Sequence, residues 1–207
     1  MNNPNTRLVV FDLETTNNPL KNYRHEIIEI AGMEIVGSKI NSSNAFYSLV
    51  RPPCKIQPYN YRVSGISDSM VKDAPAIGQV LPGFLRFIKG SPLVGHNVAF
   101  DARVLNRHLS DLGNNEVSNM LLDTLTLSRK IHKKEKLHSL DAVMKRVGIK
   151  PPRKKRHRAL EDVEYTAMVF LRLLDILKQY DITTLEAINR LCNTNCEIED
   201  FQQPQLF

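Results

Sequence analysis

The first fifty residues alternate between apolar runs and short polar interruptions. Residues 8–11 form an apolar, β-branched run that predicts a buried strand. A second strand is expected over residues 26–36, and a third over residues 45–50, after hairpin-like sequences at residues 37–39 and 41–44. The pattern therefore predicts three sequential antiparallel strands at the start of the chain.

Beyond residue 50, apolar positions recur mostly at helical spacing. An irregular stretch with a tight turn is expected over residues 59–69. It is followed by a helix over residues 79–89, with Pro82 placed in its first turn. Short strands at residues 92–95 and 121–124 each lead into a helix, the first of them capped near Asn97. A helix ended by Gly148 and a long helix over residues 159–179 complete an α/β fold with a mixed central sheet.

Composition and charge limit the class of protein. The 207 residues, 42% of them hydrophobic and 24% charged, fit one globular domain over residues 1–180 and a tail over residues 181–207. No apolar run spans a bilayer, and three cysteines form no metal-ligand pattern, so we expect a cytoplasmic protein without membrane contact. The net charge of +6 favours a polyanionic partner. Cations concentrate over residues 129–158, which favours contact with a phosphate backbone.

Carboxylates occur where the predicted strands end. Asp12 and Glu14 follow the first strand at positions i and i+2, so a strand turns both side chains to one face. Such a pair is costly to bury unless a cation lies between the two acids. Asp101 opens the helix after the fourth strand, and Asp162 opens the last long helix just after His157. Oxygen ligands of this kind suit Mg²⁺ or Mn²⁺.

Three motifs resemble those of the DnaQ-like exonucleases of the DEDDh type, which have a ribonuclease H-like fold. The sequence Phe-Asp-Leu-Glu-Thr-Thr begins at Phe11, His-Asn-x-x-Phe-Asp begins at His96, and His-x-Ala-x-x-Asp begins at His157. The resemblance covers residues 7–179. It implies a 3′-to-5′ exonuclease that binds two metal ions through Asp12, Glu14, Asp101 and Asp162, with His157 as general base.

The resemblance also implies where a nucleic acid strand would bind. Its terminal nucleotide is expected near a set of substrate-binding residues from three parts of the chain: Thr15, Thr16, Ser64, Gly65, Ile66, His96, Asn97 and Phe100. Ser64 stands where replicative proofreading members often carry a histidine, so the resemblance supports exonuclease chemistry rather than proofreading in particular. The expected substrate is a single-stranded or frayed 3′ end of DNA.

Two alternatives to a DNA exonuclease stay open on sequence alone. The same site serves exoribonucleases, and no residue identifies a 2′-hydroxyl contact. A non-catalytic nucleic-acid-binding module on the same fold is the other alternative, and the intact acids argue against it. The last residues, with Gln203, Leu206 and Phe207, resemble the peptide by which bacterial replication proteins bind the sliding clamp. A sliding clamp or DNA polymerase III is therefore an expected partner.

Overall fold

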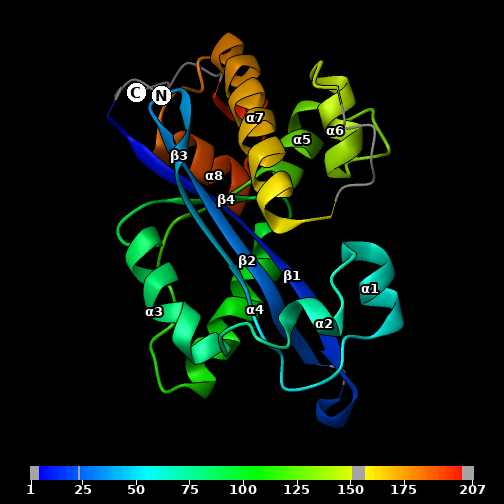
Figure 1. Cartoon of the computed structure of the whole chain (residues 1–207). Helices are drawn as coiled ribbons and strands as arrows, with labels where there is room; N and C mark the ends of the chain where they lie inside the picture. The colour runs from blue at the N-terminus through cyan, green and yellow to red at the C-terminus, as the bar shows by residue number, and fades with distance from the viewer. Residues whose placement is uncertain (1–4, 23, 151–156, 202–207) are drawn as a thin grey trace.

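The structure is a computed structural model that describes residues 5–22, 24–150 and 157–201. Its centre is a five-stranded mixed sheet with strand order β3-β2-β1-β4-β5 (Figure 1). The antiparallel strands are β1 (Arg7–Asn18), β2 (Arg24–Val36) and β3 (Lys39–Leu49). β4 (Leu93–Gly95) and β5 (Leu121–Asp123) run parallel to β1. The predicted α/β fold with three sequential antiparallel strands is confirmed.

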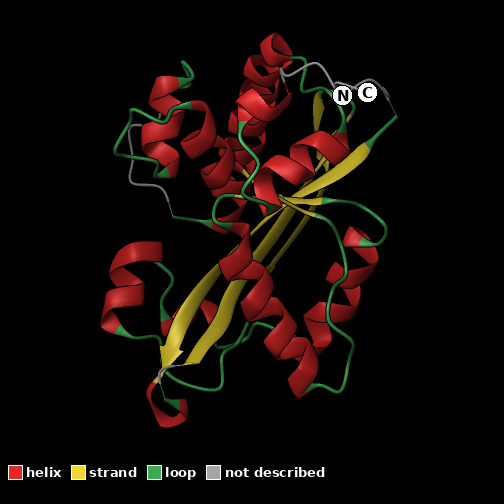
Figure 2. Cartoon of the chain, turned by 180° about the vertical axis from the view of Figure 1, so that it is seen from behind, coloured by secondary structure: helices red, strands yellow, loops and turns green. Residues whose placement is uncertain are grey.

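Helices cover both faces of this sheet, as the view from behind shows (Figure 2). One face packs on α7 (Ala159–Leu177), with α5 (Thr124–Ile131) and α6 (Leu140–Arg146) beside it. The other face packs on α3 (Ile77–Ile88) and α4 (Val98–Asp111). Successive side chains of β1 point alternately into these two cores, so the strand is apolar on both faces. Among the described residues, no helix is long and apolar enough to cross a membrane.

Two segments differ from the local predictions. Residues 59–69 are not irregular throughout, since they contain most of α1 (Pro58–Ser64) and the start of α2 (Asp68–Val71). Residues 41–44 do not form a hairpin turn. They lie inside β3, where the register jumps from a Met33–Ala45 pair to a Glu34–Asn41 pair. This bulge places three extra residues on the solvent-exposed strand, which is where extra residues are tolerated.

We predicted Pro82 in the first turn of its helix, but it lies inside α3. A proline there cannot donate the backbone hydrogen bond to Gly78, four residues earlier. Both Pro82 and Gly78 are exposed, so water can satisfy the freed carbonyl oxygen. Packing of the buried face of α3 against the sheet outweighs the lost hydrogen bond.

The segment that we separated from the domain at residue 180 packs against it as far as Phe201. A 3₁₀ turn (Lys178–Tyr180) leads to α8 (Leu185–Asn193), which lies against β5, and a second 3₁₀ turn (Ile198–Phe201) follows. Its buried side chains join the core beneath α7: Ile182, Ile188, Leu191 and Ile198. Gln203, Leu206 and Phe207 lie outside the described residues.

Candidate active site

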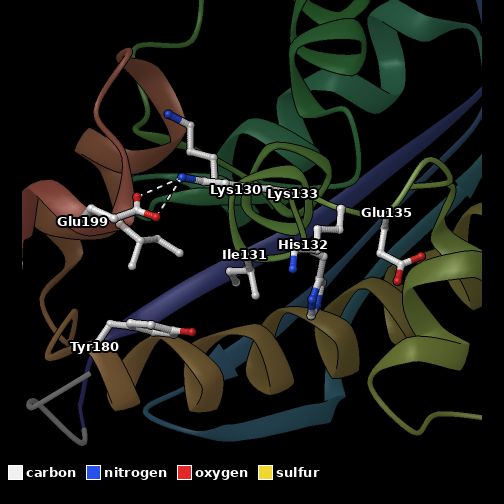
Figure 3. Close-up of a pocket in the computed structure, with 9 residues that line it drawn as sticks. Lys130, Ile131, His132, Lys133, Glu135, Tyr180 and Glu199 are labelled. Atoms are coloured by element: carbon white, nitrogen blue, oxygen red, sulfur yellow. Dashed lines mark hydrogen bonds and ion pairs between the residues drawn. The ribbon is translucent and has the colours of Figure 1, made fainter.

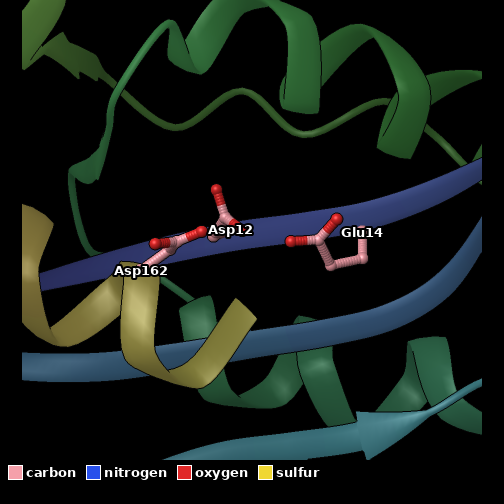
Figure 4. Close-up of side chains that lie close together, drawn as sticks. All are labelled: Asp12, Glu14 and Asp162. Atoms are coloured by element: carbon pink, nitrogen blue, oxygen red, sulfur yellow. The ribbon is translucent and has the colours of Figure 1, made fainter. Parts of the chain in front are cut away.

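Three carboxylates converge between β1 and the start of α7 (Figure 4). Asp12 and Glu14 lie on the same face of β1, because regular pairing with β2 continues through Glu14 before the register shifts. Asp162 comes from the first turn of α7, which crosses that face. One carboxylate oxygen from each of the three lies within 4.8 Å of the other two. At this spacing the three carboxylates can hold a common cation.

The fourth predicted ligand, Asp101, approaches from α4, on the other side of β1. Gly95 ends β4 so tightly that a Cβ there would lie 2.9 Å from the Val98 side chain, and the chain enters α4 at once. Asp101 is buried in the first turn, and its Oδ1 accepts a hydrogen bond from the Leu13 amide at 3.2 Å. It therefore lies directly beside the strand that carries Asp12 and Glu14, although the group of three does not include it.

The protonation of these acids reflects their crowding. Burial, followed by repulsion from Asp101 and Glu14, raises the pKa of Asp12 well above its usual value. Burial and the Asp162 charge raise the pKa of Glu14 to about 8, and burial raises that of Asp101 to about 7. Deprotonated oxygens at this spacing repel each other unless a cation offsets their charge. The donor set, all carboxylate, fits a hard divalent ion.

A buried carboxylate that the sequence analysis did not single out holds the start of α7. Glu29, on β2 and fully buried, accepts a hydrogen bond from the Ala159 amide at 2.7 Å. It also accepts hydrogen bonds from the Arg158 guanidinium at 2.6 and 2.9 Å and from the Tyr47 hydroxyl at 2.8 Å. Arg158, the N-cap of α7, makes no side-chain cap of its own. Glu29 thus caps this helix from the neighbouring strand.

His157 precedes this capped end and has a φ of +97°, in the left-handed region that a histidine adopts uncommonly. Such a conformation persists where the surrounding structure fixes it. The hydrogen bonds from Arg158 and Ala159 to Glu29 fix the two residues that follow His157. The same contacts set the position of Asp162, whose amide donates to the Arg158 carbonyl oxygen at 3.0 Å.

The predicted substrate-binding residues fall into a buried group and an accessible group. Thr16 is fully buried and accepts a hydrogen bond from the Gln57 amide at 2.9 Å, which ties β1 to α1. Ser64 is buried and bonds the Asn60 carbonyl oxygen, while Ile66 packs in a small core. The side chains of these three residues are therefore held within the fold. The accessible ones are Thr15, Gly65, His96, Asn97 and Phe100.

His96 and Asn97 are tied to the next strand. A ring nitrogen of His96 and the Thr124 hydroxyl are 2.9 Å apart, and the Asn97 amide donates to Asp123 Oδ1 at 2.7 Å. Asn97 does occupy the N-cap of α4, but with a left-handed φ of 69° and no side-chain cap. Asp123 therefore joins the ends of β4 and β5. Its position at the end of a predicted strand was the signal that could have identified it.

Part of the basic segment (residues 129–158) contacts residues 194–199 near the end of the described chain. Lys130, Lys133 and Glu199 line a pocket of about 340 Å³ beside α5 (Figure 3). Lys133 forms ion pairs with Glu199 at 2.8 Å and Glu197 at 3.2 Å, and Lys130 donates to the Thr194 carbonyl oxygen at 3.1 Å. Residues 151–156, which carry further cations, lie outside the described residues.

Comparison with known proteins agrees with this geometry. The exonuclease family matches residues 9–170. A DNA polymerase III PolC-type protein of Caldanaerobacter subterraneus subsp. tengcongensis is 40% identical over 181 residues, which cover 87% of this chain and 12% of that protein. A DNA polymerase III subunit epsilon-like protein of Rhodobacter capsulatus is 41% identical over 180 residues, 87% of this chain and 25% of that protein. The chain thus spans a minor part of these relatives.

Solved structures show the same fold. Exonuclease X in complex with 5′ overhanging duplex DNA has a TM-score of 0.68 and 26% identity, covering 90% of this chain and 99% of that one. The nuclease domain of 3′hExo, a DEDDh family member bound to rAMP, has a TM-score of 0.70 and 18% identity, covering 83% of this chain and 93% of that one. With its motifs in the predicted order and three of its acids brought together, the chain belongs to the exonuclease family.

Proposed function

We propose that this protein is a metal-dependent 3′-to-5′ exonuclease that hydrolyses DNA from a free 3′ end. The observation that carries this proposal is the convergence of Asp12, Glu14 and Asp162, with Asp101 beside them, from three separate parts of the chain. Membership of the exonuclease family supports the reaction, and the names of the relatives, which are DNA polymerase III proteins, support DNA.

The four acids are the proposed ligands of two Mg²⁺ or Mn²⁺ ions. Bound ions of this kind polarise a phosphodiester, lower the pKa of water and neutralise the leaving oxygen. The raised pKa values of Glu14 and Asp101 reflect burial and neighbouring carboxylate charge, and a bound dication would offset that charge as the acids lose their protons to solvent. Asp12, on which the charges of Asp101, Glu14 and Asp162 all act, would hold the ions together with these three acids.

His157 is the proposed general base. An imidazole with an ordinary pKa of ~6.5 is largely neutral near physiological pH and can accept a proton from an attacking water. Its place just before the capped start of α7 supports this role, since Asp162 lies in the first turn of that helix. The product of water attack at the terminal phosphodiester is a nucleoside 5′-monophosphate.

A comparison of DNA and RNA strands tests the substrate class. Single strands of the same sequence, labelled at the 3′ end, would be incubated with the protein and Mg²⁺. We expect release of a labelled nucleoside 5′-monophosphate from DNA at a higher kcat/KM than from RNA. A higher kcat/KM for RNA would assign the protein to the exoribonucleases instead. Binding of both strands without any release would indicate a non-catalytic module.

The proposed macromolecular partner is a bacterial sliding clamp or DNA polymerase III. The final peptide, with Gln203, Leu206 and Phe207, carries two apolar anchors after a run of polar residues. Extended peptides of this kind bind through a few side chains placed in a partner's pocket. Tethering would raise the local concentration of a 3′ end near the active site.

A further inference from the structure

A groove beside the candidate active site carries cations that the motifs do not include. It has a volume of about 560 Å³ and follows the outer face of α4. We call it the α4 groove. Its lining residues are His25, Phe100, Arg103, Val104, Asn106, Arg107, Ser110 and Glu116.

The residue of the α4 groove that is nearest in sequence to the candidate active site is Phe100. Phe100 directly precedes Asp101, and its ring packs edge-on against His25 with the ring centroids 4.9 Å apart. His25 in turn lies 3.4 Å from the hydroxyl of Thr15, the residue after Glu14. Two aromatic rings therefore line the end of the groove that lies beside the site, and rings of this kind are the surfaces on which unpaired bases stack.

Two arginines continue the α4 groove away from the acids. Residues 100, 103 and 107 share one face of α4 because they are three and four positions apart. Arg107 is fixed, since its guanidinium donates a hydrogen bond to the His25 carbonyl oxygen. Arg103 is exposed and has no ion-pair partner among the described residues. Both arginines act on His25 electrostatically, and with burial they lower the pKa of its ring.

The groove has one acid, at the end far from the site. Glu116 accepts a hydrogen bond from Asn106 at 3.4 Å. From residue 100 to residue 110 the face of α4 extends about 15 Å, several times the ~3.4 Å spacing of stacked bases along one strand. A surface with aromatic rings at one end, arginines along its length and this extent matches the chemistry of a single-stranded nucleic acid.

We infer that the α4 groove binds the nucleotides upstream of the scissile one: the strand leaves the terminal nucleotide past the Phe100–His25 pair, and Arg103 contacts a backbone phosphate further upstream. This inference rests on the proposed function and adds the path of the strand. It differs from the expectation for the basic segment, because Lys130 and Lys133 there are engaged by the C-terminal residues.

Steady-state hydrolysis of a dinucleotide and of a ten-nucleotide single strand of DNA tests the inference. The dinucleotide has no upstream phosphate, so the KM ratio of the two substrates isolates the groove. Arg103→Ala should raise the KM of the longer strand relative to the dinucleotide by about fivefold, the size of one solvent-exposed charge contact. It should also reduce the dependence of log KM on log salt by ~0.7.

Two further variants test whether the change in the KM ratio comes from a positive charge in the α4 groove or from the loss of any surface arginine. Arg103→Lys keeps the charge and should leave the KM ratio within about twofold of wild type. Arg172→Ala removes a similarly exposed arginine from α7, more than two helical turns beyond Asp162, and should leave the ratio unchanged. An unchanged ratio in Arg103→Ala, or an equal change in Arg172→Ala, overturns the inference. If the wild-type protein hydrolyses neither substrate in Mg²⁺, it is the proposed function that fails.

Discussion

Asp12 and Asp162 lie so close that each opposes ionisation of the other, and this repulsion is relieved when one is removed. Asp12→Asn and Asp162→Asn should each abolish Mg²⁺-dependent hydrolysis. Without metal, each should melt higher than wild type, by ~2–4 °C for each 1 kcal/mol of relieved repulsion. Thermal melting in EDTA and digestion of a labelled strand would be measured together. Asp175→Asn, an exposed acid near the end of α7, serves as the control.

Glu14 links stability to pH. Its pKa rises from 4.5 in the unfolded chain to about 8 in the folded protein, so the folded state binds its proton more tightly. Its contribution to the free energy of unfolding is therefore fully present below pH 4.5 and is lost as the pH rises through about 8. In Glu14→Gln this position does not ionise, so the free energy of unfolding does not fall for this reason as the pH rises. In EDTA, the melting temperature of Glu14→Gln relative to wild type should increase from pH 5 to about pH 9.

Other groups titrate in the same range, among them three histidines whose pKa values are lowered by burial: His25, His108 and His132. The difference between Glu14→Gln and wild type removes their contribution. A difference that stays constant across this range would contradict the raised pKa of Glu14. Saturating Mg²⁺ should stabilise wild type most at high pH, where the carboxylates are ionised.

The proposed role of His157 is tested by measuring kcat and KM separately. His157→Ala should lower kcat by ~10²–10⁴-fold, the usual contribution of general acid–base catalysis, and change KM much less. The opposite pattern, a preserved kcat with a raised KM, would make His157 a phosphate contact. Steady-state kinetics on one single strand of DNA gives both parameters.

At the scale of elements, the start of α7 depends on β2. Glu29→Gln keeps the shape of the side chain but removes the charge that holds Arg158 and the Ala159 amide. Hydrogen bonds to a charged group contribute about 1.5–3 kcal/mol, so we expect a loss of this size in the free energy of unfolding. Because Asp162 and His157 flank the capped turn, kcat should fall as well.

Tyr47→Phe is the matched control for Glu29. It removes the hydrogen bond that Tyr47 donates to Glu29 and the one that it accepts from Arg158, and leaves the contacts of Arg158 and Ala159 with Glu29 in place. Both the loss of stability and the loss of kcat should be smaller than in Glu29→Gln. If Glu29→Gln melts lower but keeps the wild-type kcat and Mg²⁺ requirement, the contact stabilises the fold without positioning the site.

The elements that carry the acids could be predicted from sequence because their signals are local. An apolar run before Asp12, the strand-to-helix turn before Asp101 and the periodicity after Asp162 each lie within a few residues of the acid. The contact of Glu29 with Arg158 joins residues 129 positions apart, and no local pattern reports such a pairing. The burial of Ser64 and Ile66 was missed for the same reason, since it depends on how α1 packs.

At the scale of the whole molecule, the chain continues past α7 without leaving the domain until at least Ile198. The predicted clamp-binding peptide follows that point. A version truncated after Gln202 should fold as the full chain does, because it retains every buried position of the described residues, and should lose binding to a bacterial sliding clamp. Titration of both forms against the clamp tests this, with full activity on free DNA as the check on folding. Equal binding by both forms, or by neither, would contradict it.

Digestion of a single strand labelled at its 5′ end tests the metal-dependent exonuclease assignment most directly. In Mg²⁺, the wild-type protein should produce a ladder of labelled products, each one nucleotide shorter than the last, because hydrolysis starts at the 3′ end. EDTA or the substitution Asp162→Asn should leave the strand intact. An undiminished ladder in EDTA or from Asp162→Asn, or immediate release of a labelled mononucleotide, would contradict the assignment.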